Sequence, residues 1–291
     1  MFQKYIHSHK ATVKLKQSSV STYCRKFERY ILPFFQNEEE TINENTVAKF
    51  TAHLQTSLAD KTTADVLGLL SEILSCSGIP IEIYKPAVYP PEIIIFTKPE
   101  WERLRSYCVS HLDTLTYGIL VAMYTGIRPG ELSATRCRHI DFHSAVFKVR
   151  FTMQRIKNPA NTEPKTKVII DTPKSHKAVR DIPLVNDLLL LGKNLYQGSP
   201  QDAFLLTGET GRFMEPRLLE DKFTKIMQAL NISGKNLYSL RHTFATDFYN
   251  KTHDVKSLSE ILGHADIKTT LNRYVHPDAE KKRQGINALL S

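Results

Sequence analysis

Hydrophobic side chains recur at helical spacing along most of the chain. The first such stretch covers residues 18–35, where one helical face would carry Val20, Tyr23, Phe27, Tyr30 and Ile31. Pro33 is expected to disturb the end of this helix, because proline has no N–H to donate. Two more helices are predicted near residues 44–55 and 62–75. Together these stretches predict a helical domain over residues 1–78.

The segment that follows, residues 78–91 (GIPIEIYKPAVYPP), contains four prolines and one glycine. That composition is typical of extended chain. We therefore expect a linker over residues 79–95 and a second domain over residues 96–291.

The second domain combines helical stretches with short alternating runs. A capping box from Thr97 to Glu100 predicts a helix to about Val109, and an apolar helix is predicted over residues 114–124. Alternating runs at 145–151, 167–171 and 179–184 predict strands, the last two joined as a hairpin around 172–178. After residue 186 the pattern is mainly helical. The expected fold class is mainly α with a small antiparallel β-sheet.

Composition and charge narrow the function. With 291 residues and 41% hydrophobic side chains, the chain has enough apolar surface for two packed cores, which excludes long disorder. The 39 basic and 30 acidic residues give a net charge of +9, which points to a polyanionic partner, nucleic acid first and an anionic membrane surface second. Residues 1–95 hold ten basic and ten acidic residues, so the whole excess lies in residues 96–291.

Cysteine spacing and hydropathy indicate the compartment. The four cysteines, Cys24, Cys76, Cys108 and Cys137, form no CxxC pair, which argues against a zinc ribbon or a disulfide framework. The longest apolar stretch, residues 115–124, is about half of the ~20 residues that a spanning helix needs, and no signal peptide is evident. We expect a cytoplasmic, nucleoid-associated protein outside the membrane.

Two arginine motifs are candidates for anion binding. In TGIRPGEL, Pro129 suits the first position of a helix, so Arg128 would lie beside a helix N-terminus with Glu131 able to orient it. The alternative is a surface pair of Arg128 with Glu131. In LYSLRHTF, Arg241 falls at the edge of an apolar stripe, where it is either a structural ion-pair residue or a ligand for an anion. His242 and His253 are expected to be ordinary surface or core histidines.

The C-terminal stretch DVKSLSEILGHADIKTTLNRYVHP predicts two short helices around a turn. Gly263 fits the left-handed position after the first helix, and His264 begins the turn. Spacing alone favours Tyr274 as a core tyrosine. Lys174, in TPKSHKAVRDIPL, lies at the expected hairpin tip, where a solvated turn is the ordinary interpretation.

Other chemistries find no support in the sequence. A metal site could be imagined from His242, His253, His264, Asp266 and His276, but no ligand spacing supports it. P-loop, GxSxG and GxGxxG motifs are absent from the sequence. We therefore expect no metal and no cofactor.

Taken in order, TGIRPGEL, a lysine before IPL, LRHTFAT and LGHADIKTTLNRY resemble the tyrosine recombinase (phage integrase) family. The stretch VSTYCRKFERYILPFF looks like that family's helical core-binding domain. The resemblance covers nearly the whole chain, in a two-domain form without an arm-binding domain. It implies an N-terminal core-binding domain that clamps DNA and an α+β catalytic domain.

The resemblance also implies roles for individual residues. Arg128 and Arg241 would clamp the scissile phosphate, and Lys174 would protonate the leaving 5′ oxygen. His264 would donate a hydrogen bond to the phosphate, Tyr274 would be the nucleophile, and Glu131 would support the site. General chemistry agrees, because two guanidiniums and an imidazole stabilise phosphoryl charge without a metal, and neighbouring cations favour a phenolate.

One position departs from the family pattern. Three residues before the second arginine the family usually has histidine, and this chain has Tyr238. A phenol there can donate a hydrogen bond but does not accept a proton near neutrality. We expect Tyr238 to be a tolerated substitution at a catalytic position.

The function expected from the resemblance is site-specific recombination through a 3′-phosphotyrosine at Tyr274, without metal or ATP, for integration, excision or inversion. The expected partner is double-stranded DNA with an inverted-repeat core site. A C-terminal exchange tail, residues 275–291, would couple a homotetramer through Ile286, Leu289 and Leu290. Two alternatives remain: a catalytically silent DNA-binding protein, to which Tyr238 points, and a topoisomerase that forms the same phosphotyrosine.

Overall fold

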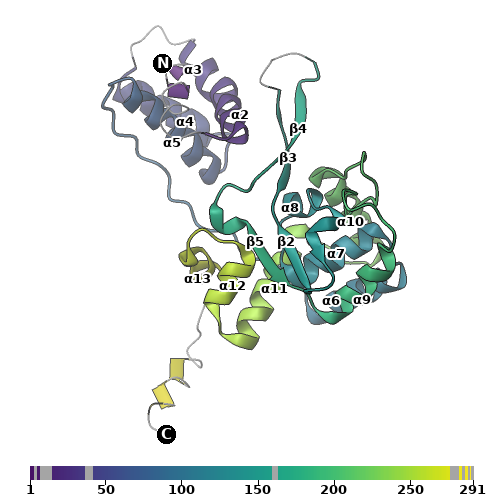
Figure 1. Cartoon of the computed structure of the whole chain (residues 1–291). Coiled ribbons are helices and arrows are strands. Elements are labelled where there is room, and N and C mark those ends of the chain that lie inside the picture. Colours follow the sequence, from purple (N-terminus) through teal and green to yellow (C-terminus); the bar gives the residue numbers. More distant parts are fainter. Residues whose placement is uncertain are drawn as a thin grey trace. The chain divides into compact units, whose positions relative to one another are not determined.

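The computed structural model describes residues 1–2, 5–6, 15–36, 42–158, 163–275, 282–283, 286–287 and 289. The chain forms two compact units, Met1–Pro91 with Arg155–Val168, and Glu92–Gln154 with Ile169–Ser291 (Figure 1). The sequence analysis did not anticipate that residues 155–168 belong with the first unit.

The first unit is helical. Its elements are α2 (Gln17–Lys26), the π-helical turn η1 (Phe27–Ile31), α3 (Leu32–Gln36), α4 (Glu44–Gln55) and α5 (Asp60–Cys76). Pro33 disturbs the helix near its end, as predicted, without stopping it. The helix widens into a π-turn just before Pro33, where the Leu32 N–H donates to the carbonyl of Phe27, five residues earlier. The helix then continues to Gln36. A π-turn of this kind accommodates the proline ring without ending the helix.

The segment predicted as a linker attaches to a core at each end. Residues 79–97 have no regular secondary structure. Ile79, Ile81 and Ile83 pack against the core of the first unit. In the second unit Phe96 is buried, and its N–H donates to Thr243 Oγ1 at 2.8 Å.

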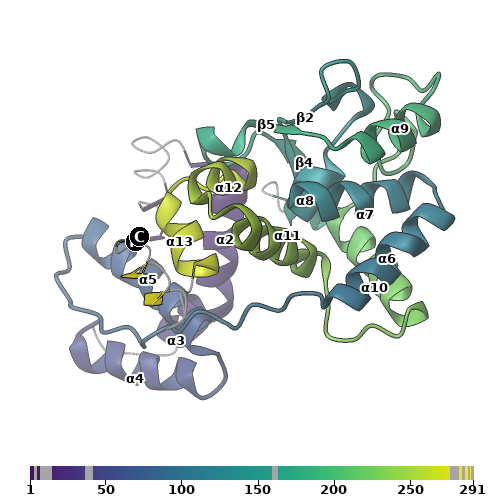
Figure 2. The same ribbon diagram turned by 90° about the horizontal axis from the view of Figure 1, so that it is seen from below.

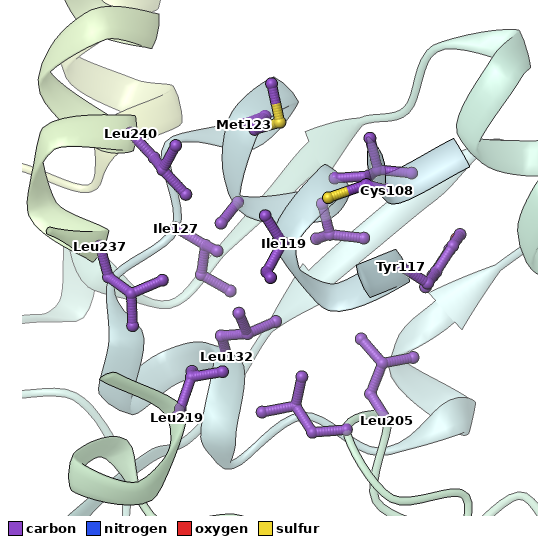
Figure 3. Packing of buried hydrophobic residues seen from close by; sticks show 14 of the residues in the cluster. Cys108, Tyr117, Ile119, Met123, Ile127, Leu132, Leu205, Leu219, Leu237 and Leu240 are labelled. Atoms are coloured by element: carbon purple, nitrogen blue, oxygen red, sulfur yellow. The ribbon is translucent and has the colours of Figure 1, made fainter. Parts of the chain in front are cut away.

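The second unit opens with α6 (Lys98–Ser110), α7 (Thr114–Thr125) and α8 (Pro129–Ser133). Later helices are α9 (Asn186–Leu195), α10 (Pro216–Ala229), α11 (Leu237–Thr252), α12 (Val255–Leu262) and α13 (Ile267–Tyr274). The capping box of Thr97 and Glu100 is confirmed at the start of α6. Nearly every residue of α7 is buried, and Ile119 and Met123 lie in the same core as Leu237 and Leu240 of α11 (Figure 3).

The strand pairing differs from the prediction. Strands β1 (Ile140–Asp141), β2 (Val146–Val149) and β5 (Arg180–Pro183) form an antiparallel sheet, with Phe147 opposite Ile182 and Val149 opposite Arg180. Strands β3 (Thr152–Lys157) and β4 (Thr166–Asp171) form a separate two-stranded ribbon. The predicted hairpin between residues 167–171 and 179–184 is therefore wrong. Residues 172–179 instead cross from one sheet to the other through the short turn η3 (His176–Ala178).

The distal part of the ribbon packs within the first unit. The backbone N–H of Lys157 donates to Ser21 Oγ at 2.9 Å, and its ammonium lies 2.6 Å from a carboxylate oxygen of Glu28. Both partners belong to the helix that begins at Gln17. Strand β3 was missed because its buried residues, Met153 and Ile156, do not alternate.

In the part of the chain that the structure describes, no helix is both long and apolar enough to span a bilayer. Of the predicted exchange tail, only residues 275, 282–283, 286–287 and 289 are described, and Ile286 and Leu289 are exposed. The docking predicted for that tail, including Leu290, otherwise lies outside the described residues.

Candidate active site

Arg128 occupies the N-cap of α8, directly after the turn that ends α7. Gly126 makes that turn possible with a φ of 60°, a left-handed conformation that residues with a Cβ rarely adopt. Pro129 takes the first helical position as predicted. The Arg128 backbone N–H and its guanidinium both donate to Glu131, at 3.1 and 2.8 Å. The guanidinium remains about one-third exposed.

Glu131 is buried and has a second cationic partner that the sequence analysis missed. The Arg180 guanidinium, on β5, donates to Glu131 at 3.0 Å and to the carbonyls of Ala178 and Ile261. Burial alone would raise the pKa of Glu131, but Arg180 and Arg128 outweigh it and lower the pKa. The sequence feature that could have revealed Arg180 is the alternation of buried and exposed residues in β5, which places Arg180 on the same buried face as Ile182.

Arg241 lies at the centre of the cluster. Helix α11 begins with Asn236 capping Ser239, which places Arg241 in the second turn with 4% of its surface exposed. Its guanidinium donates to the carbonyls of Gly126 at 2.7 Å and Leu262 at 2.9 Å. These bonds link the turn between α7 and α8 to the end of α12. Figure 2 shows the ribbons of α7 and α12, which both contact α11. The sequence analysis placed this arginine at the edge of an apolar stripe, and it is buried.

His264 follows the left-handed Gly263, as predicted. Gly263 has a φ of 64°, and a Cβ there would lie 3.0 Å from Ala178 and from Arg180, so the close approach of β5 also requires glycine. His264 Nε2 lies 3.0 Å from a nitrogen of Arg241, and Nδ1 lies 2.7 Å from Thr270 Oγ1. Because arginine has no acceptor, Nε2 accepts from Arg241 and Nδ1 carries the proton.

Tyr274 ends α13, and its hydroxyl lies in the same cluster. The ring is 6% exposed, and the hydroxyl oxygen lies 2.9 Å from Nδ1 of His242. A guanidinium nitrogen of Arg273 lies 3.3 Å from Nε2 of the same imidazole. Spacing alone gave Tyr274 as a core residue and His242 as an ordinary histidine. The signal for His242 was its place beside Arg241 on α11.

Two predicted site residues lie apart from these contacts. Lys174 is exposed on the crossover between β4 and β5 rather than at a hairpin tip. Tyr238, in the first turn of α11, is 50% exposed. Among the described residues neither side chain forms a hydrogen bond or ion pair with the cluster of Arg128, Arg241, His264 and Tyr274.

The buried cations determine the protonation of the cluster. Burial lowers the pKa of Arg241 to about 9, with Arg128 adding to the effect, so the side chain stays charged at pH 7. Burial and the charge of Arg241 lower the pKa of His264 to about 3. Burial raises the pKa of Tyr274, against the opposing charges of Arg241, Arg273 and Arg128. At pH 7 the cluster thus holds cationic arginines, neutral imidazoles and a neutral phenol.

Metal ligands do not gather in this region. Within the described ranges, no group of three or more histidine, cysteine, aspartate or glutamate side chains is arranged to hold a metal ion. The cluster instead presents guanidinium and imidazole groups, which recognise anions.

Comparison with known proteins assigns this arrangement to a family. The model of the phage integrase family matches residues 93–281, which cover most of the second unit. The chain belongs to the phage integrase family. The match includes every predicted site residue, from Arg128 to Tyr274.

Family members of similar sequence include recombinases and transposases. A tyrosine recombinase XerC-like protein of Caldanaerobacter subterraneus is 25% identical over 215 residues, which cover 68% of this chain and 54% of that protein. The transposase of transposon Tn916 from Enterococcus faecalis is 27% identical over 175 residues, 54% of this chain and 41% of that protein. The chain therefore spans about half the length of these curated relatives.

Solved structures of the family share the fold. The Tn1549 transposon integrase, in complex with transposon right-end DNA, is similar with a TM-score of 0.77 at 18% identity, covering 99% of both chains. A lambda integrase dimer bound to a core site is similar with a TM-score of 0.64 at 15% identity, covering 96% of this chain and 79% of that one. The predicted fold class, mainly α with small antiparallel sheets, is confirmed.

Proposed function

We propose that the chain cuts and rejoins DNA as a site-specific recombinase, with Tyr274 as the nucleophile. Membership of the phage integrase family and the names of its relatives support this activity. The observation that carries the proposal is the cationic cluster around Tyr274. Arg241 connects the turn that holds Arg128 to the loop that holds His264, and it is charged and buried.

The proposed reaction is a phosphoryl transfer that conserves bond energy. The Tyr274 oxygen attacks phosphorus, the bond from phosphorus to the 5′ oxygen breaks, and a 3′-phosphotyrosine forms with a free 5′ hydroxyl. The phenol loses a proton and the leaving oxygen gains one. Arg128 and Arg241 donate to the non-bridging oxygens, where negative charge is concentrated in the transition state. Religation reverses these steps with another 5′ hydroxyl and needs no ATP.

His264 and Lys174 must change their surroundings to take their proposed roles. The Nε2 atom of His264 accepts a hydrogen bond from Arg241 in the structure. When the guanidinium turns to the phosphate, Thr270 can donate to Nδ1 and the ring can carry its proton on Nε2 toward the phosphate. Lys174, exposed on its crossover, would approach the 5′ oxygen after DNA binds.

The proposed partner is double-stranded DNA. Seven Lys/Arg against one Glu in residues 1–30 and the basic excess after residue 95 would neutralise backbone phosphates in both units. The structural neighbours include an integrase in complex with transposon right-end DNA and an integrase dimer bound to a core site. We extend the proposal to an inverted-repeat core site and to a homotetramer joined by residues 275–291.

A covalent-capture experiment tests the proposal. The chain is mixed with short randomised-sequence duplexes that carry a nick, which traps the adduct because the short cleaved fragment diffuses away. After denaturation, DNA attached to protein is recovered and sequenced. We expect an adduct with wild type in the presence of EDTA and none with Tyr274→Phe. Adduct that forms equally with Tyr274→Phe assigns the nucleophile elsewhere, and adduct abolished by EDTA contradicts the metal-free mechanism.

One observation favours a second candidate, a silent DNA-binding protein. Tyr238 replaces the histidine usual in the family and is half exposed. If wild type binds the pool with steep salt dependence but forms no adduct, the silent binder is the better description.

A further inference from the structure

We infer that His242 is a positioning residue for Tyr274: the imidazole donates from Nδ1 to the phenol oxygen, and Arg273 fixes the tautomer that allows it. The inference rests on the proposed function of Tyr274, and it assigns a role to a residue next to Arg241 that is not part of the cluster predicted from sequence. It follows from two contacts on opposite sides of one ring.

The contact of His242 with Arg273 determines which group donates in the hydrogen bond between His242 and Tyr274. Arg273 approaches Nε2 of His242 at 3.3 Å. A guanidinium has five N–H donors and no acceptor, so Nε2 must offer its lone pair. A neutral imidazole carries one proton, which is then on Nδ1. At 2.9 Å from the Tyr274 oxygen, Nδ1 is the donor and the phenol oxygen is the acceptor.

This direction excludes one role and assigns another. With its proton on Nδ1, His242 is not the base that removes the Tyr274 proton. The imidazole N–H donates to one lone pair of the Tyr274 oxygen. It stabilises the phenolate that forms when Tyr274 loses its proton, because a hydrogen bond donated to a charged form stabilises that form. The charges of Arg241, Arg273 and Arg128 also favour this anion, against the burial that raises the pKa of Tyr274.

The surroundings keep the imidazole neutral. His242 lies between two cations. Arg273, on α13, contacts its ring, and Arg241 is the preceding residue on α11. Burial, then these two charges, lower its pKa to about 4. The charged groups that face Tyr274 are Arg241, Arg273 and Arg128. The pair of rings packs with centroids 5.8 Å apart at an angle of 48°, which fixes the phenol at the end of α13.

The tautomer can be measured without DNA. Nitrogen NMR of the histidine rings at pH 7 distinguishes Nδ1–H from Nε2–H, and the signals of His242 are identified by their loss in His242→Asn. We expect Nδ1–H in wild type. Arg273→Met should shift the ring toward Nε2–H, the commoner form in water. A wild-type ring with its proton on Nε2 would overturn the inference.

The effect of the hydrogen bond from His242 to Tyr274 is measured as the rate of adduct formation on a nicked duplex whose sequence was recovered in the covalent-capture experiment. His242→Ala should slow adduct formation at pH 7 about ten- to hundredfold, the usual effect of losing one hydrogen bond to a charged group. Without the donor the pKa of Tyr274 rises, so the remaining rate should increase with pH further into the alkaline range. His242→Asn, whose amide N–H can replace Nδ1–H, should restore most of the rate and the wild-type pH profile.

A matched control and two contrary outcomes complete the test. His253→Asn makes the same substitution at the far end of α11 and should leave the rate unchanged. Equal loss in His242→Ala and His242→Asn with an unshifted pH profile would reduce His242 to a packing residue. If wild type forms no adduct although the ring carries Nδ1–H, the proposed activity fails while the assigned hydrogen bond stands.

Discussion

Two buried arginines in the second unit are held in opposite ways. Arg180 and Arg241 are 8% and 4% exposed, and both donate to backbone carbonyls near the end of α12. Arg180 also has a carboxylate partner, Glu131, at 3.0 Å. Within the described ranges, Arg241 has no carboxylate within 4.0 Å, and its remaining partner is a neutral imidazole.

We interpret this difference as separating a structural charge, Arg180, from a charge proposed to bind an anion, Arg241. A buried cation is expensive unless an anion compensates it, and of these two arginines Arg180 is the one with a carboxylate partner among the described residues. The unbalanced charge of Arg241 lies beside Arg128 and Tyr274, where a phosphate would supply the missing anion. Burial alone therefore does not distinguish the two arginines, whereas the lack of a carboxylate partner for Arg241 among the described residues supports the proposed anion site.

The largest expected effect on stability comes from removing the compensated cation. Arg180→Met leaves Glu131 buried beside Arg128 alone, and we expect a loss of about 3–5 kcal/mol in the free energy of unfolding. Urea denaturation measures it. The double variant with Glu131→Gln should recover part of the loss, and a single variant as stable as wild type would contradict the structural role.

Substitution of Arg241, which has no carboxylate partner among the described residues, should affect activity more than stability. Arg241→Met should slow adduct formation by at least about 10²-fold, the effect of losing a preorganised donor to a developing anion. Its loss of stability should be clearly smaller than that of Arg180→Met, because no buried carboxylate is left behind. Both quantities come from the same protein preparations, and a larger destabilisation in Arg241→Met would erase the distinction.

Acid should weaken the two arginine sites in different pH ranges. The pKa of His264 is about 3 in the folded protein against an ordinary 6.5, so the unfolded state binds a proton first and stability falls as pH drops below 6.5. Glu131 has a pKa lowered from 4.5, so its contribution is lost only below that value. His264→Asn should reduce the slope of the urea midpoint against pH between 6.5 and 4.5, where His242 and His139, with pKa values of about 4, still contribute. The fall below pH 4.5 that is due to Glu131 should remain. An unchanged slope above pH 4.5 would be contrary evidence.

The smallest effect is expected at Tyr238, which lies outside both arginine networks. Tyr238→Phe should change the rate of adduct formation less than about tenfold, since only an exposed hydroxyl is lost. Tyr238→His provides the comparison with the usual family residue. An inert wild type that gained cleavage through Tyr238→His would show that the substitution had silenced the enzyme.

Sequence patterns predicted the local features of the site well. Pro129 and Gly263 lie where their backbone preferences placed them, because turn and cap conformations depend on few neighbouring residues. The helices α4 and α6 were also predicted closely, since both begin with strong side-chain caps.

Contacts between distant segments could not be predicted in the same way. The ion pair of Arg180 with Glu131 and the hydrogen bond of His242 with Tyr274 join residues 49 and 32 positions apart. No periodicity encodes such pairs. Strand pairing failed for a related reason, because β4 and β5 are neighbours in sequence but bond to β3 and β2.

The grouping of residues 155–168 with the first unit has a practical consequence for dividing the protein. The chain passes between its two units three times, after Pro91, after Gln154 and after Val168. A fragment that starts at Glu92 would therefore carry Lys157 without Ser21 and Glu28, and the complementary fragment would lack part of its own fold. Proteolysis or gene splitting at the 91/92 junction should yield two interdependent pieces, best recovered by co-expression.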